Sequence, residues 1–291
     1  QDALLLDGAS GAKIRKNRFG TDGSGTVYRL TGNGIALTRS TNVTIGGDTA
    51  ADGNQIVSAE TGIGVYAIGD GARPITGLKV RHNTIGTDAA GAAALGTGPG
   101  TGVLVLASAS GKATVADNLI VGTRAGVEVA GAGTAETVVS GNTIGTNTAA
   151  TAKLGTLLYG VRLDGSARSK VASNAIVVSG WDVSVAGTVE ATFTDTGYQL
   201  VPPSTAKATG PITGNDEQVT GNRIGIFSNG TKAPGSGSVG ISVWSGTSRV
   251  LVQDNTVAGH SSSEINLARG TGHQVLKNRI GVNPSGTAVL G

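Results

Sequence analysis

Three charged residues occupy matching places in two copies of a short, glycine-opening motif. Residues 126–129 read Gly-Val-Glu-Val and residues 160–163 read Gly-Val-Arg-Leu, so Glu128 corresponds to Arg162, and Asp164 follows two positions later. If the two copies pair side by side, the three side chains share one face of a sheet. Two carboxylates beside an arginine suit acid–base chemistry on a saccharide. They also suit a plain cross-strand ion pair, and the sequence leaves both interpretations open.

Further copies of the same motif carry side chains that are able to bind a sugar. Aligning the copies places Asn266 at the position of Glu128, and Tyr66 and Trp244 at the position of Asp164. Trp181 directly precedes another copy, residues 182–185. Aromatic rings offer flat apolar surfaces with a polar edge, and such surfaces suit sugar rings. We therefore predict that Tyr66, Trp181, Trp244 and Asn266 are the candidate ligand-binding residues around Glu128, Arg162 and Asp164.

Several other kinds of site are excluded or disfavoured by composition. The chain has no cysteine, and only 14% of its residues are charged, with a net charge of +3. Its one basic run, Lys13–Arg18, is too short for a nucleic-acid interface and is interpreted as a solvated strand end. The glycine pattern at 235–240 leads into a strand rather than a helix, so it predicts no dinucleotide site. The sequence also contains no acidic cluster suited to calcium, so we expect neither a metal nor a cofactor.

A recurring sequence motif marks the structural elements that position these residues. Asn-Thr-Ile-Gly-Thr-Asp at 83–88 returns as Asn-Thr-Ile-Gly-Thr-Asn at 142–147, with shorter copies at 17–22, 222–225 and 278–281. Phrases that recur at intervals of tens of residues mark a solenoid. The asparagines of the full and partial copies are Asn17, Asn54, Asn83, Asn118, Asn142, Asn174, Asn222, Asn255 and Asn278.

Each asparagine follows a short strand with alternating apolar residues, and a glycine-opening strand comes later in each unit. The sequence therefore predicts an all-β fold: one parallel β-helix domain over residues 1–291, with about nine coils of three strands and right-handed winding. Stacked coils place the nine asparagines in one column, where their amides bond to one another as a ladder. Because asparagine tolerates the left-handed backbone region, we expect it to make the turn itself.

One segment, residues 187–216, interrupts the repeat. The spacing between Asn174 and Asn222 exceeds every other spacing between neighbouring asparagines of the ladder. Alternating residues followed by Pro202 and Pro203 predict an inserted β-hairpin or flap. Long insertions are often functional or disordered, and the sequence does not assign this one a role.

With these repeats, the chain resembles right-handed parallel β-helix proteins of the pectate-lyase-like superfamily. It resembles more closely bacterial secreted and surface proteins with tandem Asn-x-Ile-Gly-Thr-Asp…Leu-Gly units, here at 83–96 and 142–155. The superfamily includes lyases, hydrolases, epimerases, phage tailspikes and adhesins, so the resemblance implies the fold rather than one function. The polygalacturonase motifs are missing. Their nearest fragment, Gly259-His260-Ser261, is interpreted as a solvated loop.

The two ends of the chain match the interior of a unit. Residues 6–10 resemble residues 163–167, and the final Leu290-Gly291 matches Leu154-Gly155, which leads into another strand. This predicts either a slice of a longer β-helix or subunits that stack head to tail.

We therefore expect an extracellular or cell-surface structural or adhesive module, bacterial in origin, whose partners are other copies of itself or a polysaccharide. The alternative is a polysaccharide lyase, glycoside hydrolase, epimerase or polysaccharide-binding module that uses the glycine-opening strands. No apolar run reaches the ~20 residues of a membrane span.

Overall fold

The structure is a computed structural model. It describes residues 2–22, 27, 32–58, 62–69, 72–95, 100–106, 112–122, 124–131, 134–155, 157–186, 216–244 and 246–291, and the backbone of 192–194 and 197–199. Among these residues, none of the helices has the length and apolar character needed to cross a membrane.

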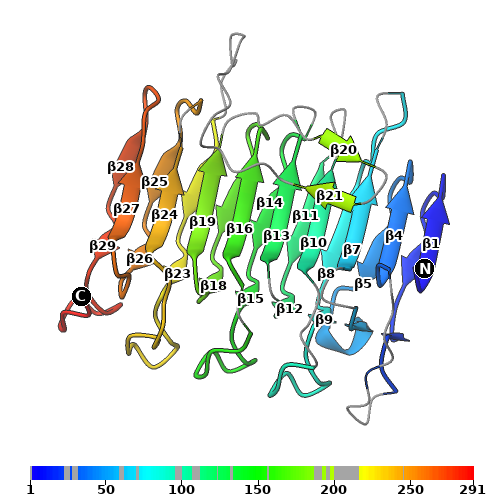
Figure 1. Ribbon diagram of the computed structural model, residues 1–291, viewed down its shortest axis with the longest axis horizontal. Helices are drawn as coiled ribbons and strands as arrows, with labels where there is room; N and C mark the ends of the chain where they lie inside the picture. Colours follow the sequence, from blue (N-terminus) through cyan, green and yellow to red (C-terminus); the bar gives the residue numbers. More distant parts are fainter. Residues whose placement is uncertain are drawn as a thin grey trace.

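Three parallel sheets of nine strands each form a parallel β-helix, as the sequence predicts. The strands of each sheet lie in a row, with the two termini at opposite ends of the molecule (Figure 1). Sheet 1 contains β1 (Leu4–Asp7), β4 (Ile35–Thr38), β7 (Ile63–Ile68), β10 (Thr101–Leu106), β13 (Ala125–Ala130), β16 (Tyr159–Asp164), β19 (Trp181–Ala186), β24 (Val239–Val243) and β27 (Ser263–Leu267).

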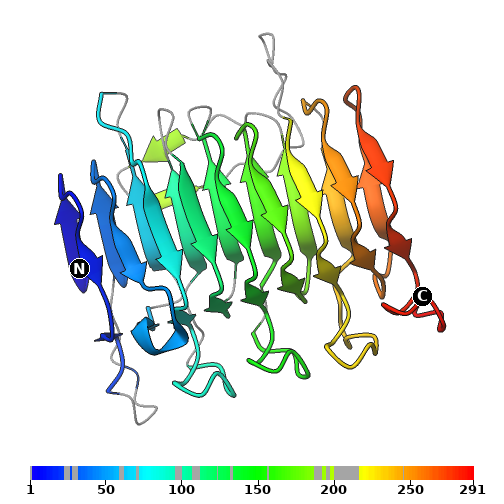
Figure 2. The ribbon, with the colours of Figure 1, turned by 180° about the vertical axis from the view of Figure 1, so that it is seen from behind.

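Sheet 2 and sheet 3 contain the shorter strands. Sheet 2 contains β2 (Lys13–Ile14), β5 (Thr44–Gly46), β8 (Leu78–Arg81), β11 (Ala113–Ala116), β14 (Val138–Ser140), β17 (Lys170–Ala172), β22 (Gln218–Thr220), β25 (Leu251–Gln253) and β28 (Gln274–Leu276). Sheet 3 contains β3 (Arg18–Phe19), β6 (Gln55–Ile56), β9 (Thr84–Ile85), β12 (Leu119–Ile120), β15 (Thr143–Ile144), β18 (Ala175–Ile176), β23 (Arg223–Ile224), β26 (Thr256–Val257) and β29 (Arg279–Ile280). The 3₁₀ turn η1 (Ala50–Asp52) lies in a loop near the N-terminal end of the rod (Figure 2).

The core is a set of apolar columns inside the three sheets. Along β13, for example, Val127 and Val129 point inward, and the register aligns them with Val161 and Leu163 of β16. All four side chains are fully buried. Since side chains alternate between the two faces of a strand, Glu128 is left on the outer face.

The asparagine column is an unbroken hydrogen-bonded ladder. Asn118 Nδ2 donates to Asn142 Oδ1 over 3.0 Å, and Asn142 Nδ2 donates to Asn174 Oδ1 over 3.0 Å. The same Oδ1 atoms accept the backbone N–H of the preceding asparagine. From Asn54 onward, each Nδ2 also donates to a backbone carbonyl of the coil before, as Asn142 does to Val115 over 2.9 Å. This pattern links all nine asparagines in order.

The left-handed residue at this corner is not the asparagine, as we expected from the sequence, but the residue before it. His82, Asp117 and Ser173 have φ angles of 56°, 57° and 57°, and Gly141 has 65°. In each of these coils the residue before the asparagine therefore makes the turn. That leaves the asparagine amide free to bond in both directions along the rod.

Glycine occupies one column of sheet 1 in β7, β10, β13, β16 and β24, where a Cβ atom would meet the neighbouring backbone. A Cβ atom at Gly126 would lie 2.6 Å from the carbonyl oxygen of Gly160 and 2.6 Å from Ile144 Cγ2. The backbone of β13 and β16 therefore approaches sheet 3 closely at this column. In β19 and β27 the corresponding residues are Asp182 and Glu264 instead of glycine.

Within the predicted insertion, β20 (Thr192–Thr194) and β21 (Gly197–Gln199) pair antiparallel as a short hairpin. Figure 1 draws the hairpin across β7 and β10. The rest of segment 187–215 lies outside the described residues.

Candidate functional site

Glu128, Arg162 and Asp164 meet on the outer face of sheet 1, in the register that the sequence suggested. Glu128 of β13 pairs directly with Arg162 of β16. Arg162 Nη2 donates to Asp164 Oδ2 over 2.7 Å, and its Nη1 lies 3.8 Å from Glu128 Oε1. A fourth residue, which the sequence did not suggest, completes the group: Arg124 Nη2 donates to Glu128 Oε2 over 2.5 Å.

This charged cluster is buried, although it lies on the outside of the rod. The Glu128 side chain is 0% exposed and those of Arg162 and Asp164 are 6% and 4% exposed, whereas Arg124 is 33% exposed. Glu128 Oε1 and Asp164 Oδ1 have no hydrogen-bond partner among the described residues. Burial raises the pKa of Asp164 to about 6, against the opposing effect of Arg162.

An aromatic pair borders the cluster. Tyr159 and Trp181 sit opposite each other in β16 and β19, with ring centroids 5.2 Å apart and planes at 16°. The Arg162 guanidinium lies 5.2 Å from the Tyr159 ring centroid, within cation–π range. Both rings are half-buried. Trp181 was a candidate from sequence, and Tyr159 was not.

Tyr66 lies in a different setting and a different column from those we expected. The register pairs Tyr66 with Leu104, and Leu104 with Glu128, so Tyr66 shares the column of Glu128 rather than that of Asp164. The sequence offered two glycines, Gly62 and Gly64, as the opening residue of this strand, and the structure uses Gly64. Tyr66 packs in an apolar patch with Ile63, Ile68, Leu104, Leu106 and Ala130.

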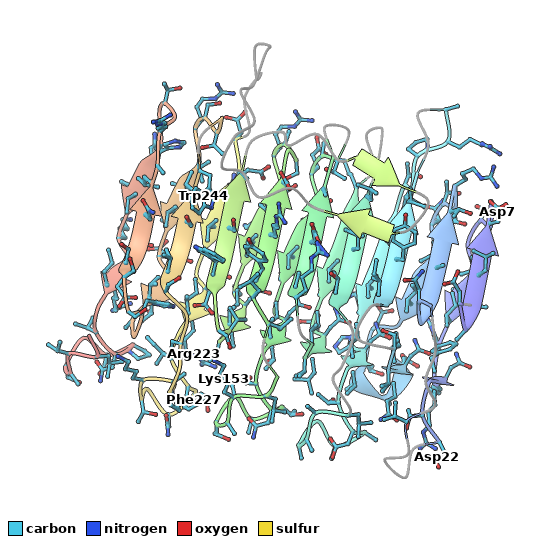
Figure 3. The ribbon with its side chains drawn as sticks, in the orientation of Figure 1. Asp7, Asp22, Lys153, Arg223, Phe227 and Trp244 are labelled. Atoms are coloured by element: carbon cyan, nitrogen blue, oxygen red, sulfur yellow. The ribbon has the colours of Figure 1, made fainter. Side chains whose placement is uncertain are left out.

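Trp244 and Asn266 do not join the cluster. Asn266 pairs with Ser242 in the last coil, three coils beyond Arg162. Trp244 follows β24, and its backbone N–H donates to Val185 over 2.8 Å. Figure 3 shows it toward the opposite end of sheet 1 from Lys153, Arg223 and Phe227.

A second buried cluster corrects our interpretation of His260, which is enclosed rather than solvated. Its side chain is 0% exposed and bridges two acids: Nε2 contacts Asp182 Oδ2 over 2.5 Å, and Nδ1 contacts Glu264. Burial alone would lower the pKa of His260, but the hydrogen bonds and charges of Asp182 and Glu264 raise it to about 9. Asp182 and Glu264 replace glycines on either side of Gly240, and His260 fills the space between them.

Another buried acid, Glu217, belongs to neither cluster. It is 1% exposed, and Ser166 Oγ donates to its Oε1 over 2.8 Å. Burial raises its pKa to about 8. Its neighbour Asp216 is exposed and pairs with Arg249 Nε over 2.6 Å.

In the described part of the chain, no group of three histidine or carboxylate side chains has an arrangement that could hold a metal ion. The acids of the outer cluster are instead paired with Arg124 and Arg162. The chemistry available there is hydrogen bonding, ion pairing and proton transfer.

Comparison with known proteins identifies the fold. A family model described as a right-handed β-helix region matches residues 1–144. No curated protein gives a significant match. The A-module of the mannuronan C-5 epimerase AlgE4 from Azotobacter vinelandii is similar in structure, with 11% identity, a TM-score of 0.45, and coverage of 100% of this chain and 76% of that one.

A second similar structure is the DFA-IIIase from Arthrobacter chlorophenolicus A6, solved without its lid in complex with GF2. The identity is 13% and the TM-score 0.37, over 94% of this chain and 75% of that one. At such identities, structural likeness does not extend to activity. The three nine-stranded parallel sheets, with a right-handed β-helix match over the first part of the chain, show the fold: a right-handed parallel β-helix.

Proposed function

We propose that this protein binds a polysaccharide on the outer face of sheet 1, at Arg124, Tyr159 and Trp181. The observation that supports this most strongly is the buried Glu128–Arg162–Asp164 cluster, which contacts Arg124 through Glu128 and Tyr159 through Arg162. Trp181 stacks on Tyr159. In this account the exposed parts of Arg124 and the two rings contact the ligand, and the cluster holds them in place.

The energetic cost of the cluster argues for a role beyond stability. Removing charged groups from water costs several kcal/mol per ion, and apolar residues of similar size often stabilise a fold better. The coil before Glu128 uses that solution, with Leu104 and Leu106 of β10 on the same face. Retaining four charges here, with two carboxylate oxygens that have no hydrogen-bond partner in the described part of the chain, is more typical of a functional site.

The composition of the site points to a hydroxyl-rich ligand. Arg124 and Arg162 balance Glu128 and Asp164, so the site has no large net charge to attract a polyanion by itself. Aromatic edges beside paired charged groups favour rings that present both C–H and O–H groups. The straight row of parallel strands suits an extended polymer.

Binding assays on the two tryptophans test this proposal. We expect Trp181→Ala to weaken binding to a panel of neutral and acidic polysaccharides by about tenfold or more. Trp244→Ala is the matched control and should bind as the wild type does, because Trp244, two strands from Asp164 in the same column, makes no ring stacking or hydrogen bond with the cluster among the described residues. Equal loss in both variants, or no saturable binding to any member of the panel, would exclude a site centred on Trp181.

A catalytic role on the same ligand is a second candidate, and it is favoured by Asp164. A carboxyl group whose pKa is about 6 can take up or release a proton near neutral pH. Hydrolysis, elimination and epimerisation of a saccharide all need such a group. Release of reducing ends or unsaturated products from acidic polysaccharides, abolished in Asp164→Ala, would establish it. Turnover that survives this substitution would remove Asp164 from the mechanism.

A structural role as a rod that stacks on other copies is a further proposal. Apolar side chains at the last coil favour it: Leu276 and Ile280 are 44% and 47% exposed. Sedimentation of this chain at rising concentration tests it, and Leu276→Lys should reduce any association. A monomer at all concentrations would rule it out. An extracellular or cell-surface location belongs with either proposal, because polysaccharides and adhesive fibres are found there.

A further inference from the structure

A cavity opens on the outer side of sheet 3, near the N-terminal end of the rod. Its volume is about 240 Å³, and its walls include Lys16, Asn17, Arg18, Gln55, His82 and Thr84. One water needs only about 10–15 Å³, and drug-sized ligands fill roughly 300–1,000 Å³. The cavity therefore fits one small molecule or one sugar unit.

Three cationic or potentially cationic side chains line this cavity. Lys16 and Arg18 come from the basic run that the sequence analysis interpreted as a solvated strand end, and His82 comes from the next corner but one. The Nδ1 atom of His82 lies 2.9 Å from the carbonyl oxygen of Gly47, so Nδ1 carries the proton and Nε2 is left for another partner. Arg18 Nη1 makes a long contact of 3.4 Å to the carbonyl oxygen of Asp22.

Among the residues that the structure describes, no carboxylate lines the cavity. The nearest acid with a defined contact is Asp52 of η1, whose Oδ1 lies 3.8 Å from Lys16 Nζ. That distance exceeds a hydrogen bond, and the Lys16 side chain is 66% exposed. An incoming anion can therefore engage Lys16 without breaking a tight ion pair.

We propose that this cavity binds an oxyanion group (a carboxylate, sulfate or phosphate) either as a small free anion or as the charged group of a single sugar unit. Lys16 and Arg18 supply the charge, and Thr84 and His82 supply hydrogen bonds to neighbouring oxygens or hydroxyls. This site lies on a different sheet from the proposed polysaccharide face and stands independently of it.

The chain contains its own control for this proposal. The last coil repeats the same three residue types, Lys-Asn-Arg, at 277–279, and Lys277 has the same left-handed backbone as Lys16, with φ angles of 55° and 58°. Lys277 and Arg279 do not line the cavity. Lys16→Asn with Arg18→Ala, and Lys277→Asn with Arg279→Ala, therefore remove the same charges from equivalent corners, and asparagine tolerates the left-handed backbone.

The experiment is a calorimetric titration of the full chain at constant ionic strength. Sodium sulfate, glucuronate and glucose are each added in a separate titration. We expect saturable binding of sulfate or glucuronate at one site and none of glucose. The change at residues 16 and 18 should weaken binding by about tenfold or more, and the change at 277 and 279 should leave it unchanged. Binding of both anions assigns the site to free oxyanions, whereas binding of glucuronate alone assigns it to a sugar acid.

Other outcomes would overturn the proposal. These are the absence of saturable binding in the wild type, equal loss in both double variants, or undiminished binding after the change at residues 16 and 18. If that variant does not fold by circular dichroism, His82→Asn provides the test, because it keeps a residue that tolerates the turn and removes Nε2. Unchanged binding in His82→Asn would then contradict the proposal.

Discussion

At the scale of single residues, two buried ionisable groups should control how stability depends on pH. Glu217 is enclosed with a serine, and burial holds its pKa at about 8. His260 is enclosed between two acids, which hold its pKa at about 9. Both values are raised above those of an unfolded chain. Each group therefore stabilises the protein most below its unfolded pKa, and the stabilisation is lost as pH rises through the folded value.

Glu217→Gln should make the protein more resistant to alkali. Glutamine keeps a group that accepts from Ser166 and cannot ionise, so it removes the cost of a buried carboxylate. We expect similar stability of variant and wild type at pH 4, and a variant that is more stable by up to about 4 kcal/mol above pH 8. Urea unfolding at several pH values measures this difference. A difference that stays constant across that range would show that Glu217 does not titrate in the folded protein.

His260→Gln should destabilise the protein, and the loss of stability should be largest at low pH. Removing the imidazolium leaves Asp182 buried without its partner, which costs roughly 3–5 kcal/mol. The loss should be full below about pH 6.5 and should shrink as pH rises through 9, where the wild-type histidine also loses its proton. Guanidinium unfolding at pH 6 and at pH 9.5 compares the two conditions. A loss that grows with pH would contradict the assignment.

At the scale of the elements, the asparagine ladder and the left-handed corner before it define the turn between sheets 2 and 3. Asn142 is 1% exposed and bonds to both neighbouring asparagines and to Val115. Asn142→Ala leaves several buried groups without partners, so we expect a loss of about 3 kcal/mol. Asn17→Ala, where water reaches the amide, should lose less than half as much. Equal losses of stability in the two variants, measured by thermal unfolding, would show that burial of the amide does not increase its contribution.

The left-handed corner offers a stabilising substitution. Ser173 has a φ of 57°, and the equivalent corners of the neighbouring coils carry Gly141 and Gly221 with φ angles of 65° and 64°. Ser173→Gly relieves the strain of a Cβ atom there and should raise stability by roughly 0.5–1 kcal/mol, after the added entropy of the unfolded chain. Ser173→Ala keeps the Cβ atom and should bring no gain. Differential scanning calorimetry of the two variants separates these outcomes.

At the scale of the whole molecule, the sequence predicted the architecture because every coil is built from the same kinds of strand and turn. The asparagine phrase and the glycine-opening strand recur in nearly every coil, so an error in one copy does not change the fold. Individual copies were less reliable. Gly62 and Gly64 both fit the opening position, and choosing the first moved Tyr66 by two residues, into the wrong column. The left-handed turn residue was also predicted one position too late, at the asparagine itself. The repeat period alone does not show which of two adjacent residues makes the turn.

The candidate site was predictable only in part. Register alone brought Glu128 and Arg162 together, but burial depends on packing that a repeat pattern does not contain. The link between His260 and Asp182 joins residues 78 positions apart. A signal for it existed, since Asp182 and Glu264 replace glycine in an otherwise small-residue column. Glu217 also carried a signal, because it lies two residues before the inward-facing Val219 and so shares its face.

Fluorescence of the two tryptophans tests the central proposal most directly, because the chain contains only Trp181 and Trp244. Trp244→Phe leaves Trp181 as the sole reporter, and Trp181→Phe leaves Trp244. Titration with the polysaccharide that binds the wild type should shift the emission of the Trp181 reporter with a saturable dependence and leave the Trp244 reporter unchanged. A saturable shift in the Trp244 reporter alone would contradict a binding face centred on Trp181 and the Glu128–Arg162–Asp164 cluster.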